Sequence, residues 1–339
     1  MNLQQLRYIV EVSRCGMNIS HAAESLKMTQ PAISIQIRNF ERNLGVKIFD
    51  RGMAGKKLKG FTQAGQAILD RAKTILSEVH NIEIISKEYS DPSRGVLSIA
   101  TTHTQARYKL PSVLKTFVHR FPEVRLNIKQ GTPIEIVEMA MRGDVDCCIT
   151  TQDIDSHDDL LMLPCYRWNR CIITPCGHPL RDEKNLTLEA VAKYPIITYV
   201  DGFTGRSKLD RAFVKAGLIP NVVLNAADTD VIKAYVRQGL GVAIVSNIAY
   251  DSQIDTDLFA LDVSHLFEDS VTSFGLRRDS MLPSYLYDFI ELFAPHLTRE
   301  QVEEAQSTRN GSELSNLSLN APFFPSVEHG PYLVNDRFG

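Results

Sequence analysis

The first sixty residues carry apolar positions at helical spacing in three stretches. They predict a first helix from Leu3, a second from about Ser20, and a third after a tight turn, with Thr29 as its N-cap and Gly45 at its end. The apolar positions of the first and third stretches lie mostly three or four residues apart: Leu3, Leu6, Ile9 and Val10, then Ile33, Ile37, Phe40 and Leu44. Two helices joined by a tight turn, the second amphipathic, are typical of a helix-turn-helix.

The outward face of the third helix is polar and fits the major groove of DNA. Hydroxyl and amide groups near its N-terminus can reach base edges, and a guanidinium can neutralise phosphate. The residues concerned are Thr29, Gln30, Pro31, Ser34 and Arg38. Residues 46–49 and 58–62 predict two strands around a basic loop, whose Arg51, Lys56 and Lys57 suit a wing along the DNA backbone. A small helical bundle without a DNA role is the alternative, but it leaves the charge pattern unexplained.

The net charge of −3 hides an uneven distribution. Residues 1–62 contain ten Lys or Arg against four Asp or Glu, a net charge of +6, so the remaining chain carries −9. A basic module on an acidic body indicates a polyanionic partner for the first segment alone. The 339 residues also exceed the usual size of one hydrophobic core, so we expect more than one domain.

A single long helix is predicted over residues 63–91, since no proline interrupts the chain before Pro92. Its apolar positions alternate steps of four and three, as in a short coiled coil: Ile68, Ala72, Ile75, Val79 and Ile82. Such a helix spans roughly 43 Å at about 1.5 Å per residue. In a dimer it would hold two DNA-binding heads at a fixed separation. Packing of the stripe on a later domain of the same chain is the alternative.

Strands and helices alternate from Val96 onward, which predicts two α/β lobes. The first series has strands near residues 96–100, 125–128 and 145–149, and helices near 105–120 and 133–142. The second has strands near residues 171–173, 195–197, 222–224 and 242–245, and helices near 187–192, 207–216 and 229–238. Such alternation implies parallel sheets, and residues 271–295 should return to the first lobe. Ligands of such folds bind at the carboxyl ends of strands, in the crevice between lobes.

Two strand-to-helix turns offer hydroxyls and free backbone amides to an anion. Residues 101–105 follow the first strand of lobe one, and residues 202–207 precede a helix of lobe two. Because helix starts favour negative charge, the pair could clamp a carboxylate or a sulfate between the lobes. Taken singly, such runs of Thr and Ser are more often ordinary helix caps.

Particular residues near the N-terminus give a more specific signal. The sequence resembles the signature of the LysR-type transcriptional regulators at Thr29-Gln30-Pro31-Ala32-Ile33-Ser34, Ile37, Glu41, Leu44-Gly45, Phe49 and Thr62-Gln63-Ala64-Gly65. The resemblance continues to about residue 300. It is strongest to the group that regulates cysteine biosynthesis and sulfur assimilation, from residues 3–12 to residues 293–299. Phe40 replaces the usual leucine and the loop at 52–55 differs in length, which bears on the operator sequence and not on DNA binding itself.

The resemblance implies an α/β chain in three parts. A winged helix-turn-helix (1–62) and a linker and dimerisation helix (63–92) would precede a two-lobed, periplasmic-binding-protein-like effector domain (93–300). Lobe I would comprise about residues 93–167 and 270–300 and lobe II about residues 168–269. The tail from about residue 303 is rich in Ser, Asn, Gly and Pro without periodicity, which predicts disorder over 301–339, although Phe323-Phe324 and Tyr332-Leu333-Val334 could dock on a neighbour. Residues of both lobes would line the effector site: Thr102, Thr104, Gln105, Thr151, Trp168 and Thr204.

The same resemblance implies a homodimer or homotetramer that binds promoter DNA and contacts RNA polymerase, mainly as an activator. The N-terminal stretch without a basic lead or a long apolar run predicts that the protein stays in the cytoplasm. N-acetylserine or O-acetylserine would be the effector, and sulfate or thiosulfate could occupy the same pocket. A related regulator of other sulfur-source genes, with a different small anionic effector, is the alternative.

Other classes of protein fit the sequence less well. The N-terminal stretch has no basic lead and no long apolar run, which argues against an exported solute-binding receptor and against a membrane protein. The Gly-x-Ser-x-Gly, Gly-x-Gly-x-x-Gly, P-loop and His-Glu-x-x-His motifs of enzymes are absent, so we expect no catalysis, no cofactor and no metal site. The six cysteines lack Cys-x-x-Cys spacing and are expected to be buried thiols: Cys15, Cys147, Cys148, Cys165, Cys171 and Cys176.

Overall fold

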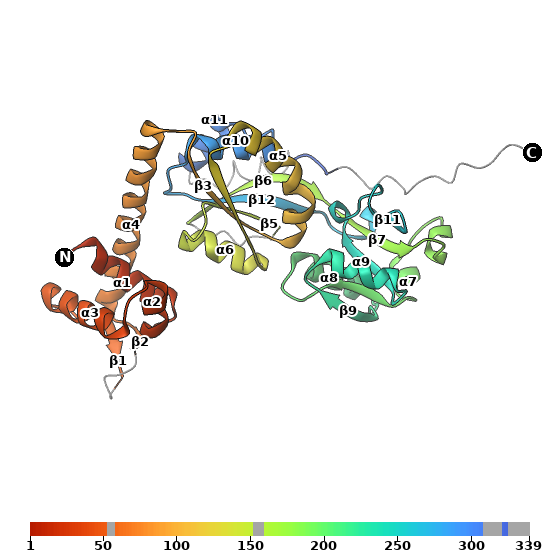
Figure 1. Cartoon of the computed structure of the whole chain (residues 1–339). Helices are drawn as coiled ribbons and strands as arrows, with labels where there is room; N and C mark the ends of the chain where they lie inside the picture. The colour runs from red at the N-terminus through yellow and green to blue at the C-terminus, as the bar shows by residue number, and fades with distance from the viewer. Residues whose placement is uncertain (53–57, 152–158, 308–320, 325–339) are drawn as a thin grey trace, which may run out of the picture. The chain divides into compact units, whose positions relative to one another are not determined.

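The computed structural model describes residues 1–52, 58–151, 159–307 and 321–324 (Figure 1). The chain forms two compact units. Met1–Asp91 and Asp279–Pro283 make up the first, and Pro92–Arg278 with the described residues from Ser284 onward make up the second. Within the described ranges, every helix is too short or too polar to cross a bilayer.

The first unit is a three-helix module with a β-hairpin. Helices α1 (Leu3–Arg14), α2 (Ile19–Ser25) and α3 (Gln30–Leu44) precede strands β1 (Phe49–Arg51) and β2 (Leu58–Phe61), which pair antiparallel. Gly45 ends α3 in the left-handed conformation, with φ of 71°. Most of the apolar positions predicted from the sequence meet in one core, in which Ile9, Ile33, Ile37 and Phe40 are buried. Leu3 and Leu44, at the ends of their helices, are exposed instead.

One buried carboxylate fixes the hairpin on this core. Glu41 is 3% exposed and accepts hydrogen bonds from the N–H groups of Ile48 at 2.9 Å and Phe49 at 3.2 Å. Its second oxygen lies 3.2 Å from Nη2 of Arg51. A buried charge is tolerated when it is paired and hydrogen-bonded, so this cluster determines where β1 begins.

Helix α4 (Gln63–Ser90) follows the hairpin directly. Near its start, Gly65 lies so close to a carbonyl oxygen of the hairpin segment that a Cβ would be 1.9 Å from it, so only glycine fits. Leu69 and Ala72 are buried in the core of the module. The first part of the predicted seam therefore packs within the unit, whereas Ile75 and Ile82 farther along are exposed.

The second unit contains two five-stranded sheets, one in each lobe. In lobe I the strand order is β4-β3-β5-β12-β6. The strands are β3 (Gly95–Thr101), β4 (Val124–Gln130), β5 (Cys147–Thr150), β6 (Leu160–Trp168) and β12 (Ser270–Arg277). The helical segments of the lobe are η1 (Gln105–Lys109), α5 (Leu110–Arg120), α6 (Pro133–Arg142), α10 (Ser284–Phe293) and α11 (Arg299–Ser307). Helix α6 packs on β3 and β5, and α5 packs on α10.

In lobe II the strand order is β11-β7-β10-β8-β9. The strands are β7 (Arg170–Pro175), β8 (Ile196–Tyr199), β9 (Val222–Ala226), β10 (Val242–Ser246) and β11 (Leu258–Asp262). The α-helices are α7 (Leu188–Val191), α8 (Thr204–Lys215) and α9 (Thr229–Arg237), and the 3-10 turns are η2 (Pro179–Asp182), η3 (Asn247–Ala249) and η4 (Ser264–Leu266). Residues of β7, β8 and β10 form the centre of the lobe's core, including Ile172, Ile196 and Ile244.

Both sheets are mixed, which corrects the prediction of parallel sheets. β3 runs parallel to β4 and β5, and β8 runs parallel to β9 and β10. By contrast, β12 is antiparallel to β5 and β6, and β7 is antiparallel to β10 and β11. The chain crosses between lobes from β6 to β7 and returns from β11 to β12. Because β7 and β12 start at a crossing, where their neighbours end, they run against those neighbours.

The C-terminal region departs from the expectation of disorder in two segments. Arg299–Ser307 form α11, in which Val302 and Ala305 are buried. Ala321–Phe324 lie against β6, where Arg167 and Phe323 form a parallel bridge. α11 packs on the preceding helix α10 and on β6, whereas the partner of Phe323, Arg167, lies far away in the sequence. The polar local composition does not reveal either contact. Residues 308–320 and 325–339 lie outside the described residues.

Candidate functional site

The outward face of α3 presents the polar residues predicted to contact DNA. Thr29, Gln30, Pro31 and Arg38 are exposed, and Ser34 is half-buried. Thr29 precedes the helix, but its hydroxyl makes no capping hydrogen bond. Gln30 Nε2 donates to Ser34 Oγ at 3.1 Å, and Arg38 Nε donates to the Ser34 carbonyl at 3.2 Å. The contacts align these side chains in one strip of polar groups, as base and phosphate recognition requires.

Of the wing residues predicted to contact DNA, the structure describes Arg51. This residue pairs with the buried Glu41, so part of its guanidinium is engaged within the three-helix module. The sequence does not reveal this pairing, because the two residues lie in different elements. Lys56 and Lys57 lie outside the described residues.

A pocket in the second unit brings together five of the six residues predicted to bind an effector. Its empty volume is about 410 Å³ with the open mouth included, which suits a small ligand. Its lining comprises Thr102, Thr104, Gln105, Pro133 and Thr151 of lobe I, Trp168 at the crossing, and Tyr199, Phe203, Gly205 and Ser246 of lobe II. The sixth predicted residue, Thr204, begins α8, but its side chain lies outside the described part of the structure.

A hydrogen-bond network supports the lobe I side of the pocket. At its centre is the buried Thr272, whose Oγ1 lies 2.9 Å from Thr151 Oγ1 and accepts from Trp168 Nε1 at 3.1 Å. Gln105 Nε2 donates to the same oxygen at 3.4 Å, and Tyr166 OH donates to Gln105 Oε1. Burial raises the pKa of Tyr166, so its phenol remains a donor at neutral pH. The network therefore orients three lining side chains through contacts within the protein.

The lobe II wall combines aromatic rings with an unsatisfied hydroxyl. The rings of Tyr199 and Phe203 lie 6.0 Å apart and nearly parallel, and Tyr199 OH is 2.9 Å from Thr229 Oγ1. Ser246 is 3% exposed, and its Oγ has no hydrogen-bond partner among the described residues. An unsatisfied buried hydroxyl costs about 1–3 kcal/mol. A polar atom of a ligand or a water at this point would therefore be stabilising.

The pocket offers neutral donors to a ligand. Within the described residues, no charged side chain lines it. Strands β3, β5, β8 and β10 end beside it, as ligand sites of α/β folds usually do. Helical segments begin there at Thr104 and, with α8, after Phe203. Free N–H groups at helix starts favour negative charge, so this arrangement can hold an anion without a counter-charge in the lining.

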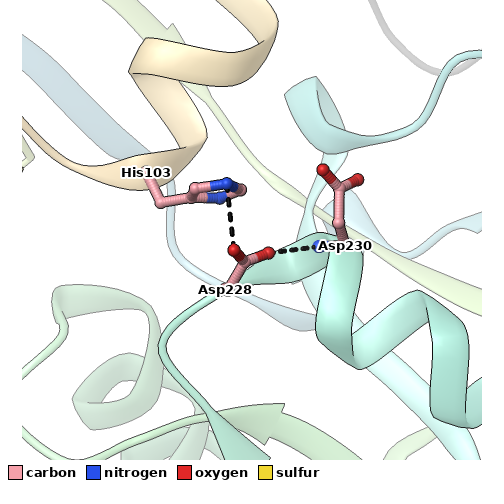
Figure 2. Close-up of side chains that lie close together, drawn as sticks. All are labelled: His103, Asp228 and Asp230. Carbon is pink, nitrogen blue, oxygen red and sulfur yellow. Dashed lines mark hydrogen bonds and ion pairs between the residues drawn. The ribbon is translucent and has the colours of Figure 1, made fainter.

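Three contacts join the two lobes next to the pocket. Figure 2 shows His103 and Asp228, whose Nε2 and Oδ2 lie 3.0 Å apart, together with Asp230. Arg107 Nε lies 3.0 Å from Asp230 Oδ2, and Tyr108 OH donates to Asp230 Oδ1. Burial opposes ionisation of Asp230, but hydrogen bonds from Tyr108 and Arg107 outweigh it and lower the pKa of this carboxyl. We call these three contacts the interlobe latch.

The latch also has a spacing that could suit a metal ion, since one ligand atom from each of His103, Asp228 and Asp230 lies within 4.8 Å of the others. Two cations already compensate the Asp230 carboxylate. Arg107 contacts Asp230, and Lys233 Nζ lies 3.6 Å from the same carboxylate. A divalent ion would be repelled by both cations, so the geometry favours ion pairing between the lobes over metal binding.

The cysteines are less uniformly buried than expected. Four of them are buried, whereas Cys15 is half-buried and Cys176 is exposed. Burial raises the pKa of Cys148 and of Cys171 to about 12. These two thiols are therefore poor nucleophiles. Cys176 follows directly after β7, so the end of the strand explains its exposure.

Five lining residues were not among the six named from the sequence: Pro133, Tyr199, Phe203, Gly205 and Ser246. Tyr199 and Ser246 occupy the last positions of β8 and β10, so a search of all strand ends that face the crevice would have found them. Phe203 and Gly205 lie in the turn at 202–207 that was predicted to face an anion, whereas no local signal distinguishes the helix-start residue Pro133 from a packing residue.

Two family models match the chain. Residues 3–66 match the bacterial regulatory helix-turn-helix protein, lysR family, and residues 90–298 match the LysR substrate binding domain. Among curated relatives, CysB of Haemophilus influenzae is 47% identical over 317 residues, covering 94% of this chain and 97% of that protein. SsuR of Burkholderia cenocepacia is 46% identical, covering 89% and 97%, and Cbl of Escherichia coli K12 is 41% identical, covering 89% and 95%.

Solved structures give the same fold. The cofactor-binding domain of the Cbl transcriptional regulator aligns with a TM-score of 0.59 and 43% identity, over 62% of this chain and 92% of that chain. Full-length OxyR of Pseudomonas aeruginosa aligns with a TM-score of 0.64 over 86% of this chain and 97% of that chain. At 20% identity, the latter similarity concerns the fold alone.

Proposed function

The chain belongs to the LysR family of transcriptional regulators, and we propose that it controls genes of sulfur assimilation and cysteine biosynthesis, mainly as an activator. The resemblance predicted from the sequence is confirmed by both family matches. Similarity to CysB, SsuR and Cbl over about nine-tenths of the chain supports a sulfur-related role. Its relatives regulate transcription and are not enzymes.

The proposed effector is an acetylated serine, N-acetylserine or O-acetylserine, with sulfate or thiosulfate as further ligands. The observation that supports this best is the pocket between the lobes, which is lined by neutral donors and contains the unsatisfied hydroxyl of Ser246. A carboxylate or sulfate would accept from hydroxyls and helix-start amides. The rings of Trp168, Tyr199 and Phe203 would contact the acetyl group.

A fluorescence titration tests this proposal, because Trp168 is the only tryptophan of the chain and lines the pocket. We expect a saturable change with the acetylated serines and none with unacetylated serine. Thr102→Val should weaken the response, and the exposed Thr116→Val on α5 serves as matched control. No response to any ligand and no shift in melting temperature would withdraw the sulfur assignment while leaving the family assignment intact.

A second candidate is a related regulator of other sulfur-source genes with a different small anion as effector. The chain is 46% identical to SsuR and 47% identical to CysB, and this near-equal similarity supports the second candidate. The same titration separates the two, since this candidate responds to a sulfur anion but not to the acetylated serines.

On the DNA side, we propose that Thr29, Gln30 and Ser34 read base edges of a promoter while Arg38 and the wing lysines contact phosphates. Ser34→Ala should then weaken binding to the specific site more than to random DNA. Joint replacement of Lys56 and Lys57 should weaken both and flatten the salt dependence. Equal losses on specific and random DNA for Ser34→Ala would refute this division.

We further propose a homodimer or homotetramer that contacts RNA polymerase at the promoter. The exposed Ile75 and Ile82 on α4 support a seam between two copies. Ile82→Glu should shift the sedimentation coefficient toward the monomer. An unchanged coefficient would place the interface elsewhere.

A further inference from the structure

The last described residues of the chain, Ala321–Phe324, form a short clip on the open edge of lobe I. β6 is an edge strand of its sheet. The Arg167 N–H donates to the Pro322 carbonyl at 2.8 Å, and the Phe324 N–H donates to the Arg167 carbonyl at 2.7 Å. Ala321 is buried. The clip thus pairs the backbone N–H and carbonyl of Arg167 on this open edge through one isolated parallel bridge.

The two phenylalanines of the clip lie in different surroundings. Phe323 is 57% exposed, and its ring lies 4.2 Å from the Arg167 guanidinium. Phe324 is half-buried, and its ring lies 5.7 Å from that of Tyr166. Lys109 Nζ lies 5.9 Å from the Phe324 ring and 5.5 Å from the Tyr166 ring. Successive residues of an extended segment point to opposite faces, so Phe324 alone packs toward the interior.

Tyr166 connects this contact to the pocket. Its side chain is buried, and the ring is held by Phe324 on one side and by Phe293, at 5.9 Å, on another. Its hydroxyl donates to Oε1 of Gln105, which lines the pocket. The orientation of the Gln105 amide therefore depends on the position of the tyrosine ring.

We propose that the C-terminal clip holds Tyr166 in place and thereby sets the orientation of Gln105, which makes Phe324 a positioning residue for effector binding. The proposal rests on the proposed function of the pocket. Removal of the Phe324 ring leaves a gap beside Tyr166, because the surrounding side chains relax only partly. The freed ring then samples other positions, so the Gln105 Oε1 loses its donor and the amide is held only by the 3.4 Å hydrogen bond from Nε2 to Thr272 Oγ1.

A double-mutant cycle tests this coupling in the full chain. Phe324→Ala should weaken N-acetylserine binding on the order of fivefold, and Phe324→Leu should restore part of the loss. Phe323→Ala, the matched control, should change the affinity less than about twofold, the range of uncoupled surface changes. In the Gln105→Ala background, Phe324→Ala should have no further effect. An equal loss in both backgrounds, or no loss in either, overturns the proposal.

A measurement without ligand separates this inference from the function of the pocket. The side-chain amide of Gln105 can be observed by NMR in protein with isotope-labelled glutamine and assigned by its loss in Gln105→Ala. Phe324→Ala should shift that signal, and Phe323→Ala should leave it in place. If wild-type protein does not bind N-acetylserine, the proposed effector is wrong. The Gln105 amide signal still tests the role of the clip in that case. An unshifted signal in Phe324→Ala overturns it.

Discussion

Replacing Thr272 by valine would remove the hydroxyl at the centre of the pocket network with little change of shape. Hydrogen bonds with Trp168, Gln105 and Thr151 would be lost, each contributing about 1 kcal/mol. Trp168 keeps its contact with Thr151 at 3.3 Å. We therefore expect the free energy of unfolding of the second unit to fall by about 2 kcal/mol. For a unit of this size, the loss corresponds to a melting temperature lower by about 4–8 °C.

Trp168 fluorescence reports this transition, because the only tryptophan lies in the second unit. Thr272→Ser is the matched control, since it keeps the hydroxyl and loses one methyl group, at a cost of about 1 kcal/mol. Effector affinity, measured by calorimetry, should fall about tenfold for valine, equivalent to about 1.4 kcal/mol, and stay unchanged for serine. A valine variant with wild-type melting temperature and affinity would show that this network does not orient the pocket.

Three further outcomes follow from buried or paired charges and thiols. Glu41→Ala should lower the free energy of unfolding of the DNA-binding module by about 3–5 kcal/mol, because Arg51 and the N–H groups of Ile48 and Phe49 lose their partner. Calorimetry should show no such loss for the exposed Glu24→Ala. The lowered pKa of Asp230 stabilises the native state above the ordinary Asp value of about 4, and this contribution is lost as pH falls through the native pKa. The melting temperature should thus fall more steeply with decreasing pH for wild type than for Asp230→Asn. Parallel curves would show that the Asp230 contacts of the interlobe latch do not stabilise the native state. Iodoacetamide should label the exposed Cys176 and spare Cys148, whose pKa burial raises to about 12; mass spectrometry that finds native Cys148 labelled would show that its sheet opens.

Local patterns predicted the helices of the first unit and the strands β3, β4, β5, β7, β8, β9 and β10, but not β6, β11 or β12. The spacing of Ile33, Ile37 and Phe40 located α3, because one face of the helix packs on a single core. The turn that contains Thr102 and Thr104 was recognisable, because polar residues directly after a buried strand mark a strand end.

Contacts between distant segments were not predictable in the same way. Thr272 is 121 residues from Thr151 and sits in a strand whose pattern resembles ordinary core. The antiparallel strands at the crossings depend on the path of the chain between lobes, which periodicity does not record. The aromatic pair Phe323-Phe324 was recognisable as a segment that could dock, but its contact with Tyr166 depends on the shape of the sheet edge. Tertiary proximity decides these features, and the residues concerned carry no distinctive local signal.

On the proposed function, a small molecule in the pocket controls how the protein engages a promoter. The most direct test is a footprinting and affinity measurement of the full-length protein on promoter DNA of a cysteine-biosynthesis operon, with and without saturating N-acetylserine. Linkage between the two sites requires a change in affinity, typically about 5–150-fold, or a change in footprint or bending of the complex. Unchanged affinity, footprint, bending and transcription at saturating effector would contradict the claim.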